Sequence, residues 1–87
     1  MPYVDRETRK RLDAGGRPRT AGELNYCITK LVDEYTGTKG QLSYGIINEV
    51  MGVLDCARHE FYRRIAAPYE DRKIMENGEV YRNRPTD

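Results

Sequence analysis

Cys56 and His59 are the two side chains of this sequence best placed to bind a metal ion together. They stand three residues apart, so a helix would bring them to one face, and Cys27 lies in an earlier segment. A structural zinc site needs four ligands, and a catalytic site needs three and a water molecule. No second Cys or His pair completes such a set. We therefore expect no metal and no other cofactor, and we expect both cysteines to pack as free thiols inside apolar helices.

Acid–base and nucleophilic chemistry find equally little support. His59 is the one histidine, and no third group that could orient it stands near it in the sequence. The segment Gly37–Gly40 lacks the spacing of a phosphate-binding loop. Asp33, Glu34 and Glu49 lack the paired Glu-x-x-Glu and Glu-x-x-Asp spacing of helical magnesium-dependent pyrophosphatases. The sequence thus predicts no catalytic residue and favours a non-enzymatic protein.

Aromatic and charged side chains alternate in two segments, Glu60–Arg64 and Pro68–Lys73. Rings beside arginines can stack on bases and hold phosphates. An internal salt bridge between residues 60 and 64 is the simpler interpretation, because they are spaced i, i+4. Both interpretations stay open at this point. The candidate ligand-binding or partner-binding residues in these segments are Tyr62, Arg63, Arg64, Tyr69 and Asp71.

Two further groups of residues are candidates for contacts with a ligand or with another subunit. Asn25, Tyr26 and Asn48 are polar residues in the first turns of two predicted helices. A glycine inside a helix costs about 1 kcal/mol relative to alanine, so Gly52 suggests the close approach of a second backbone. The predicted oligomer interface consists of Gly45, Glu49, Gly52 and Cys56, which share one side of a helix.

The composition allows one small domain with a thin core. The chain has 87 residues, of which 38% are apolar and 33% are charged. A core of this size often depends on a partner subunit. The net charge is +1, but residues 1–20 hold six basic and three acidic groups, a balance of +3, and residues 21–56 hold two basic and five acidic groups, a balance of −3. This asymmetry favours head-to-tail contact between chains or a weak phosphate contact.

The elements that would position these residues are predicted to be helices. Asp5 can cap a short first helix, which Gly15-Gly16-Arg17-Pro18 ends as a flexible linker. Thr20 and Glu23 form a capping box for a second helix, in which each side chain bonds the other residue's amide. Its apolar residues fall at helical spacing, and they are Leu24, Cys27, Ile28, Leu31, Val32 and Tyr35. Gly37 is available for a left-handed cap at its end.

A third helix is predicted from Tyr44 to Ala67, with Ser43 as its cap. Its main apolar stripe is Ile47, Val50, Leu54, Ala57, Phe61 and Ile65, and Ile46 and Val53 widen it. This width predicts that the helix packs on the second helix and on something else as well. Pro68 is expected to end or kink the helix, or to begin a new one that runs to Glu76 and closes at Asn77-Gly78.

The motifs together resemble those of a family of small uncharacterised phage and bacterial proteins. They are Gly22-Glu23-Leu24-Asn25-Tyr26-x-Ile28-Thr29, Asn48-Glu49-Val50-x-Gly52-Val53-Leu54, Glu60-Phe61-Tyr62-Arg63-Arg64 and Pro68-Tyr69-Glu70-Asp71-x-Lys73-Ile74-x-x-Asn77-Gly78-x-Val80-Tyr81. The match covers residues 20–81. The resemblance implies a stand-alone intracellular protein encoded by a phage or prophage, and it brings no catalytic residue. The segment between Leu12 and Thr20 is shorter than the family's usual first helix.

The expected fold is all-α: an antiparallel helical hairpin over residues 20–78 with short flanking helices, completed to a bundle by homo-oligomerisation. Residues 1–19 are expected to be a basic segment and linker that docks loosely, and residues 79–87 a mobile tail. The predicted function is binding, by occupying a host protein or a small anionic, nucleotide-like ligand. The alternative is a nucleic-acid-binding accessory protein. A start that leads straight into charge and the lack of a long apolar run predict a cytoplasmic protein without a membrane span.

Overall fold

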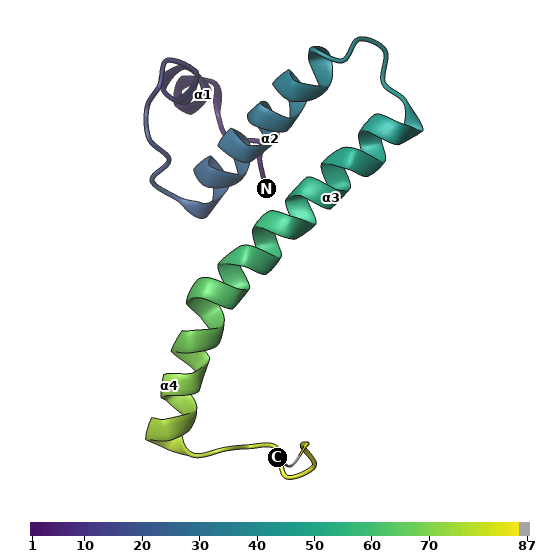
Figure 1. The fold of residues 1–87 in the computed structure, drawn as a ribbon. Coiled ribbons are helices and arrows are strands. Elements are labelled where there is room, and N and C mark those ends of the chain that lie inside the picture. Colours follow the sequence, from purple (N-terminus) through teal and green to yellow (C-terminus); the bar gives the residue numbers. More distant parts are fainter. Residues whose placement is uncertain (86–87) are drawn as a thin grey trace. The chain divides into compact units, whose positions relative to one another are not determined.

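The computed structural model describes residues 1–85, and every regular element in them is a helix. The elements follow one another as α1 Arg6–Asp13, α2 Ala21–Gly37, α3 Tyr44–Phe61, a π-helical turn η1 Tyr62–Ala66, and α4 Ala67–Asn77 (Figure 1). The all-α prediction is therefore confirmed. The chain divides into two units, Met1–Val50 and Met51–Asp87, each described by itself.

The first unit is organised by the packing of α1 on α2. Asp5 caps α1 as predicted, because its carboxylate accepts a 2.8 Å hydrogen bond from the amide of Thr8. This bond holds the pKa of Asp5 below its ordinary value, since it favours the charged carboxylate. Leu12, near the end of α1, is buried. The loose docking that we expected for residues 1–19 is thus not what the structure has.

The segment between α1 and α2, which we expected to be a flexible linker, follows a backbone path that requires glycine at two positions. Gly15 has a φ of +99°, which an L side chain rarely adopts. At Gly16, a Cβ atom would lie 2.7 Å from the carbonyl oxygen of Arg11, so only glycine lets the chain pass there without displacement. The Arg11 guanidinium also donates a 2.8 Å hydrogen bond to the carbonyl oxygen of Arg17. The two glycines therefore permit one particular backbone path between α1 and α2, which the sequence pattern did not predict.

The capping box of α2 forms in part. The Thr20 hydroxyl accepts a 3.1 Å hydrogen bond from the Glu23 amide, as predicted. The Glu23 carboxylate turns to a different amide, that of Arg19 at 2.9 Å, and it also pairs with the Arg11 guanidinium of α1. Glu23 therefore fastens α1 to the start of α2. At the other end, the positive φ of +82° falls at Gly40 and not at Gly37, which is still helical.

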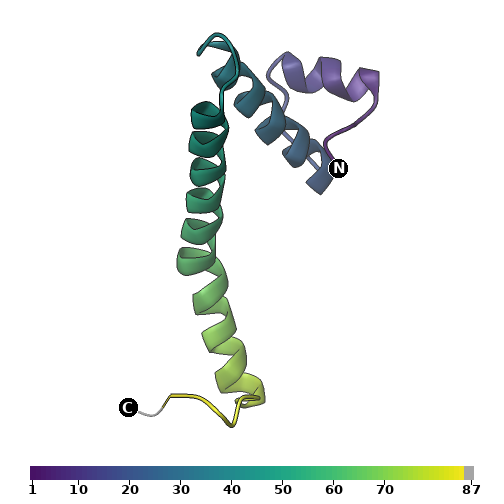
Figure 2. The ribbon, with the colours of Figure 1, turned by 90° about the vertical axis from the view of Figure 1, so that its right-hand side faces the viewer.

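The helices from Tyr44 to Asn77 follow each other without a break in the backbone (Figure 2). Ser43 caps the start of α3, because its hydroxyl accepts a 3.2 Å hydrogen bond from the Ile46 amide. Pro68 neither ends nor breaks the helical path, because it lies in the first turn of α4, where its missing N–H is tolerated. The π-helical turn η1 comes directly before it, and the Ala67 amide bonds the Tyr62 carbonyl five residues back. This wider turn gives room for a proline ring that would clash in a regular α-helix.

The helical path ends at Gly78, as predicted, with a φ of +94° and a 2.8 Å hydrogen bond from its amide to the Ile74 carbonyl. Residues 79–85 form no regular element. Part of the predicted 79–87 tail, residues 86 and 87, lies outside the described residues.

Candidate functional site

The apolar stripe of α2 is the first candidate surface. Leu24, Ile28, Leu31 and Tyr35 follow one another at intervals of four, three and four residues, which places them along one side of the helix. All four are exposed, Leu31 most of all at 67%. We call these four residues the α2 stripe. Within the N-terminal unit, none of these four side chains is buried.

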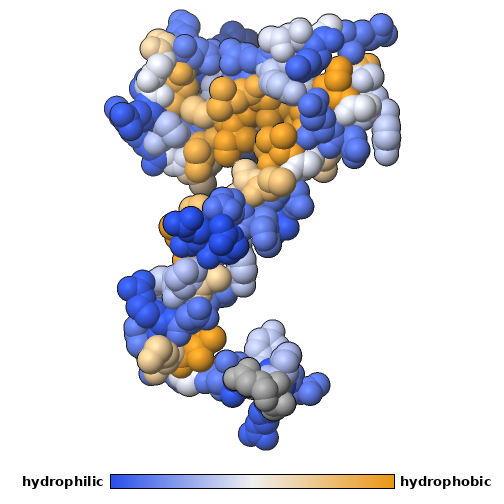
Figure 3. All heavy atoms as spheres, in the orientation of Figure 1, coloured by the Kyte–Doolittle hydropathy of each residue, from blue (hydrophilic) through white to orange (hydrophobic). Residues whose placement is uncertain are grey.

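A second exposed stripe lies on α3. It consists of Ile47, Val50, Leu54, Ala57 and Phe61, at intervals of three, four, three and four residues, and we call it the α3 stripe. Val50 is half-buried and the other four residues are exposed, Phe61 at 65%. On the face in Figure 3, apolar side chains gather over the N-terminal unit, to which α2 and the first turns of α3 belong. Exposed apolar area of this extent is typical of a surface that binds another molecule.

The first helix, α1, packs on a different side of α2 from the α2 stripe. Tyr26 is buried under α1, and its hydroxyl donates a 2.7 Å hydrogen bond to Asp13. This bond raises the pKa of Tyr26, because it stabilises the protonated phenol. Tyr26 lies two residues after Leu24, which is about 200° around the helix. The first helix thus covers the side of α2 opposite the stripe, and Tyr26, a predicted binding residue, has a structural role.

The predicted interface of Gly45, Glu49, Gly52 and Cys56 faces away from the α3 stripe, since Gly52 follows Val50 by two residues, again about 200° around the helix. A Cβ atom at Gly52 would meet nothing within 4 Å. No second backbone of the described chain therefore approaches this glycine. Cys56 is exposed and Cys27 half-buried, so the expected burial is wrong for Cys56, and both are free thiols.

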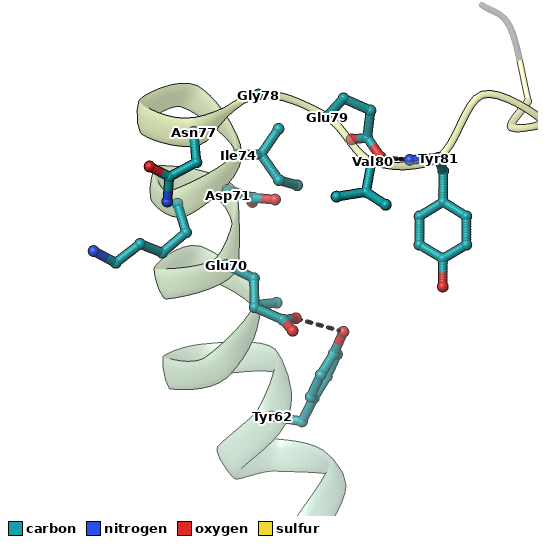
Figure 4. Close-up of a pocket in the computed structure, with 11 residues that line it drawn as sticks. Tyr62, Glu70, Asp71, Ile74, Asn77, Gly78, Glu79, Val80 and Tyr81 are labelled. Carbon is teal, nitrogen blue, oxygen red and sulfur yellow. Dashed lines mark hydrogen bonds between the residues drawn. The ribbon is translucent and has the colours of Figure 1, made fainter.

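The C-terminal unit contains a shallow pocket of about 500 Å³ beside α4. Tyr62 and Glu70 point toward one another across its wall, and the Tyr62 hydroxyl donates a 3.2 Å hydrogen bond to the Glu70 carboxylate (Figure 4). This bond raises the pKa of Tyr62, because it favours the neutral phenol beside a carboxylate. The other charged and apolar lining residues include Asp71, Lys73, Glu79, Ile74, Val80 and Tyr81.

The remaining predicted binding residues do not form one site. Of the candidates near the C-terminal end, Tyr62 and Asp71 line this pocket, and Arg63, Arg64 and Tyr69 do not. Arg63 pairs with Glu60 at 3.3 Å, so the internal salt bridge that we expected for residues 60 and 64 forms one residue earlier. The guanidinium of Arg72 and the ammonium of Lys73 lie within 6 Å of the Tyr69 ring. Asn25 and Asn48 are exposed on α2 and α3.

Metal-binding geometry is absent from residues 1–85, where no three His, Cys, Asp or Glu side chains are grouped to hold an ion. Within the same residues, no helix is both long enough and apolar enough to cross a membrane.

A family model described as a domain of unknown function (DUF6899) matches residues 1–80. The chain belongs to this family. Its match begins at the first residue, so it includes α1 as well as α2, α3 and α4. No curated protein and no solved structure matches the chain. The residues matched by the DUF6899 family model therefore include both α1 and α2, and the match assigns no activity.

Sequence reasoning missed the residues that join distant parts of each unit. Asp13 and Arg11 entered the sequence analysis only through the charge balance of residues 1–20, although they contact Tyr26 and Glu23 of α2. Glu70 lies eight residues from Tyr62, a spacing that no regular helical pattern marks as a pair. The available signal was Pro68, because a proline within a continuous helical pattern implies a distorted turn before it.

Proposed function

We propose that this chain is a non-enzymatic interaction protein, which acts by binding another polypeptide along its α2 and α3 stripes. One observation carries the proposal. Leu12 and Tyr26 are the two buried apolar side chains of residues 1–85, while twenty large apolar side chains are exposed. Folding must offset roughly 1–2 kcal/mol of backbone entropy per residue, and two buried side chains supply only a few kcal/mol. Partner binding would bury the missing apolar surface.

The charged surface favours the interaction protein over the nucleic-acid-binding alternative. Of the basic groups predicted to contact phosphate, Arg11 pairs with Glu23 and Arg63 with Glu60. Lys10 pairs with Glu7 and Arg58 with Asp55. Such pairs weaken the local positive field that would draw in a polyanion. No specific feature of the described residues supports a nucleic-acid site, and that alternative stays a prediction.

Site-specific photo-crosslinking in the native host tests the proposal. A photoreactive phenylalanine derivative is placed at Leu31 or Ile47, one on each stripe, and the matched control is placed at His59, which is exposed on the opposite side of α3. We expect covalent adducts to a polypeptide from both stripe positions and far fewer from the control. Equal yields at all three positions, or no adduct at any, would overturn the proposal.

A further inference from the structure

The pocket beside α4 is built within the C-terminal unit alone. All of its lining residues lie between positions 62 and 81, so its composition does not depend on the N-terminal unit. Gly78, with its φ of +94°, turns the chain out of α4. Val80 and Tyr81 then point back along the side of α4 that carries Glu70 (Figure 4). The pocket volume of about 500 Å³ lies within the range of small-molecule sites, about 300–1,000 Å³.

The carboxylates of the pocket outnumber its cations. Glu70, Asp71 and Glu79 line it, and Lys73 is the basic residue among the lining side chains. The Lys73 ammonium pairs at 3.2 Å with Glu76, which does not line the pocket. The positive charge of Lys73 is therefore matched by a carboxylate outside the pocket. The three lining carboxylates then give the pocket a negative potential, which attracts a cation.

These carboxylates can accept further hydrogen bonds. Glu70 accepts one of 3.2 Å from the Tyr62 hydroxyl, and Glu79 accepts one of 2.8 Å from the Tyr81 amide. An ionised carboxylate has about four acceptor positions, so each can also bond a ligand. No three acidic, His or Cys side chains of residues 1–85 are grouped to hold one ion together. Because a divalent metal ion needs several oxygen ligands at short distance, the spacing of the carboxylates favours an organic cation.

The rest of the lining supplies apolar and aromatic surface. Ile74 and Val80 are aliphatic, and the Tyr62 and Tyr81 side chains line the same pocket. An aromatic ring attracts an ammonium or guanidinium ion at its face. Aliphatic side chains suit the methylene stem that carries such an ion in lysine, arginine and alkylamines. The pocket thus combines the two kinds of surface that an organic cation presents.

We propose that the pocket between α4 and residues 79–81 binds a small organic cation, an ammonium or guanidinium group on an aliphatic stem. The carboxylates of Glu70, Asp71 and Glu79 bind the charged group, and the stem packs on the apolar lining. The ligand is opposite in charge to the anionic ligand that the sequence led us to expect. The pocket shares no residue with the α2 and α3 stripes, so this binding goes beyond the proposed contact with a polypeptide and does not depend on it.

NMR titration of the full chain with butylammonium tests the charge of the ligand. Butan-1-ol is the neutral probe of the same stem length, and sodium chloride controls for ionic strength. We expect butylammonium to shift the amides of Ile74, Gly78 and Val80, and butan-1-ol at the same concentration to shift them at least about threefold less. Equal shifts with butan-1-ol or with sodium chloride, or no shift with butylammonium, would overturn the proposal.

Two matched variants test the place of binding. Asp71→Asn removes a carboxylate from the pocket, and Asp55→Asn makes the same change outside it. We expect Asp71→Asn to weaken butylammonium binding by about two- to fivefold, as for an exposed ion pair, and Asp55→Asn to leave it unchanged. Glu79→Gln lies outside every helix and replaces Asp71→Asn if that variant loses helicity. Unchanged affinity in the pocket variant, or an equal loss in Asp55→Asn, rejects this site.

Two further probes distinguish the sources of the cation, a free amine and the side chain of a peptide. They are 1,4-diaminobutane and a peptide with one lysine between glycines. Tighter binding of the diamine supports a free polyamine as the ligand, and tighter binding of the peptide supports a lysine side chain. If neither probe shifts the pocket amides, the proposal fails.

Discussion

The Tyr26 hydroxyl of α2 donates a 2.7 Å hydrogen bond to the Asp13 carboxylate at the end of α1. The Arg9 guanidinium lies 5.8 Å from the centre of the same tyrosine ring. The Tyr26 side chain thus connects α2 to α1 in two ways. Its hydroxyl bonds Asp13, and its ring lies under the Arg9 guanidinium. This contact and the Glu23–Arg11 pair hold α1 in place, so α1 is part of the N-terminal unit and not an appendage.

Removing the Tyr26 hydroxyl should loosen α1 without removing the ring. Tyr26→Phe leaves Asp13 without its donor, and we expect a loss of about 1–2 kcal/mol in the stability of the α1–α2 contact. Amide hydrogen exchange in α1 measures this loss directly. Tyr44→Phe is the matched control, because the Tyr44 side chain is 81% exposed. Equal exchange rates in the two variants would show that the Asp13 bond contributes nothing.

The docking of α1 should weaken in acid. The Arg19 amide, followed by the Arg11 guanidinium, holds the pKa of Glu23 below its ordinary value of 4.5. A carboxylate with a lowered pKa in the folded state contributes stability that is complete above its unfolded pKa and is lost as the pH falls through its folded pKa. The protection of α1 amides from hydrogen exchange, corrected for the pH dependence of the intrinsic exchange rate, should therefore fall as the pH drops below about 4.5. Glu23→Gln should reduce this pH-dependent step and leave the part that comes from Asp5, whose pKa is also lowered; a step of unchanged size in Glu23→Gln would contradict the assignment.

Gly52→Ala distinguishes the two sides of α3. No atom lies within 4 Å of the added methyl group, and alanine favours a helix over glycine by about 1 kcal/mol, so we expect a stabilisation of about 0.5–1 kcal/mol in thermal or denaturant unfolding. Gly78→Ala is the opposing control, because the φ of +94° at Gly78 strains any side chain. A clear destabilisation by Gly52→Ala would instead support a close subunit contact on the glycine side.

Pro68→Ala should convert η1 into regular α-helix. Alanine restores an amide donor and removes the proline ring, which would clash with the preceding turn of a regular α-helix. The Tyr62–Ala66 segment then no longer needs the π-helical hydrogen bond from the Ala67 amide to the Tyr62 carbonyl. The change in turn moves Tyr62 relative to Glu70, and we expect the bond between them to be lost. Carbon chemical shifts of residues 62–67 report the conversion, and the pKa of Tyr62 should return toward its ordinary value. Pro85→Ala, outside every helix, is the control.

Much of the secondary structure follows from local patterns. The caps at Asp5, Thr20 and Ser43, the apolar periodicity of α2 and α3, and the end at Gly78 are all properties of neighbouring residues, which the sequence displays directly. Periodicity also identified both apolar stripes. It did not say what covers them, because a repeat reports which residues share a side of a helix and not which surface lies opposite.

The sequence by itself thus determined that the chain is helical, where most helices begin and end, and which residues line the stripes. Only the tertiary structure decided that α1 covers the Tyr26 side of α2 and that Glu23 pairs with Arg11. The physical reason is the sequence separation over which each kind of interaction acts. Caps and periodicity act within one or two turns of helix, whereas the contacts of Asp13 and Arg11 with α2 span twelve or thirteen residues and depend on a loop path that only Gly15 and Gly16 allow.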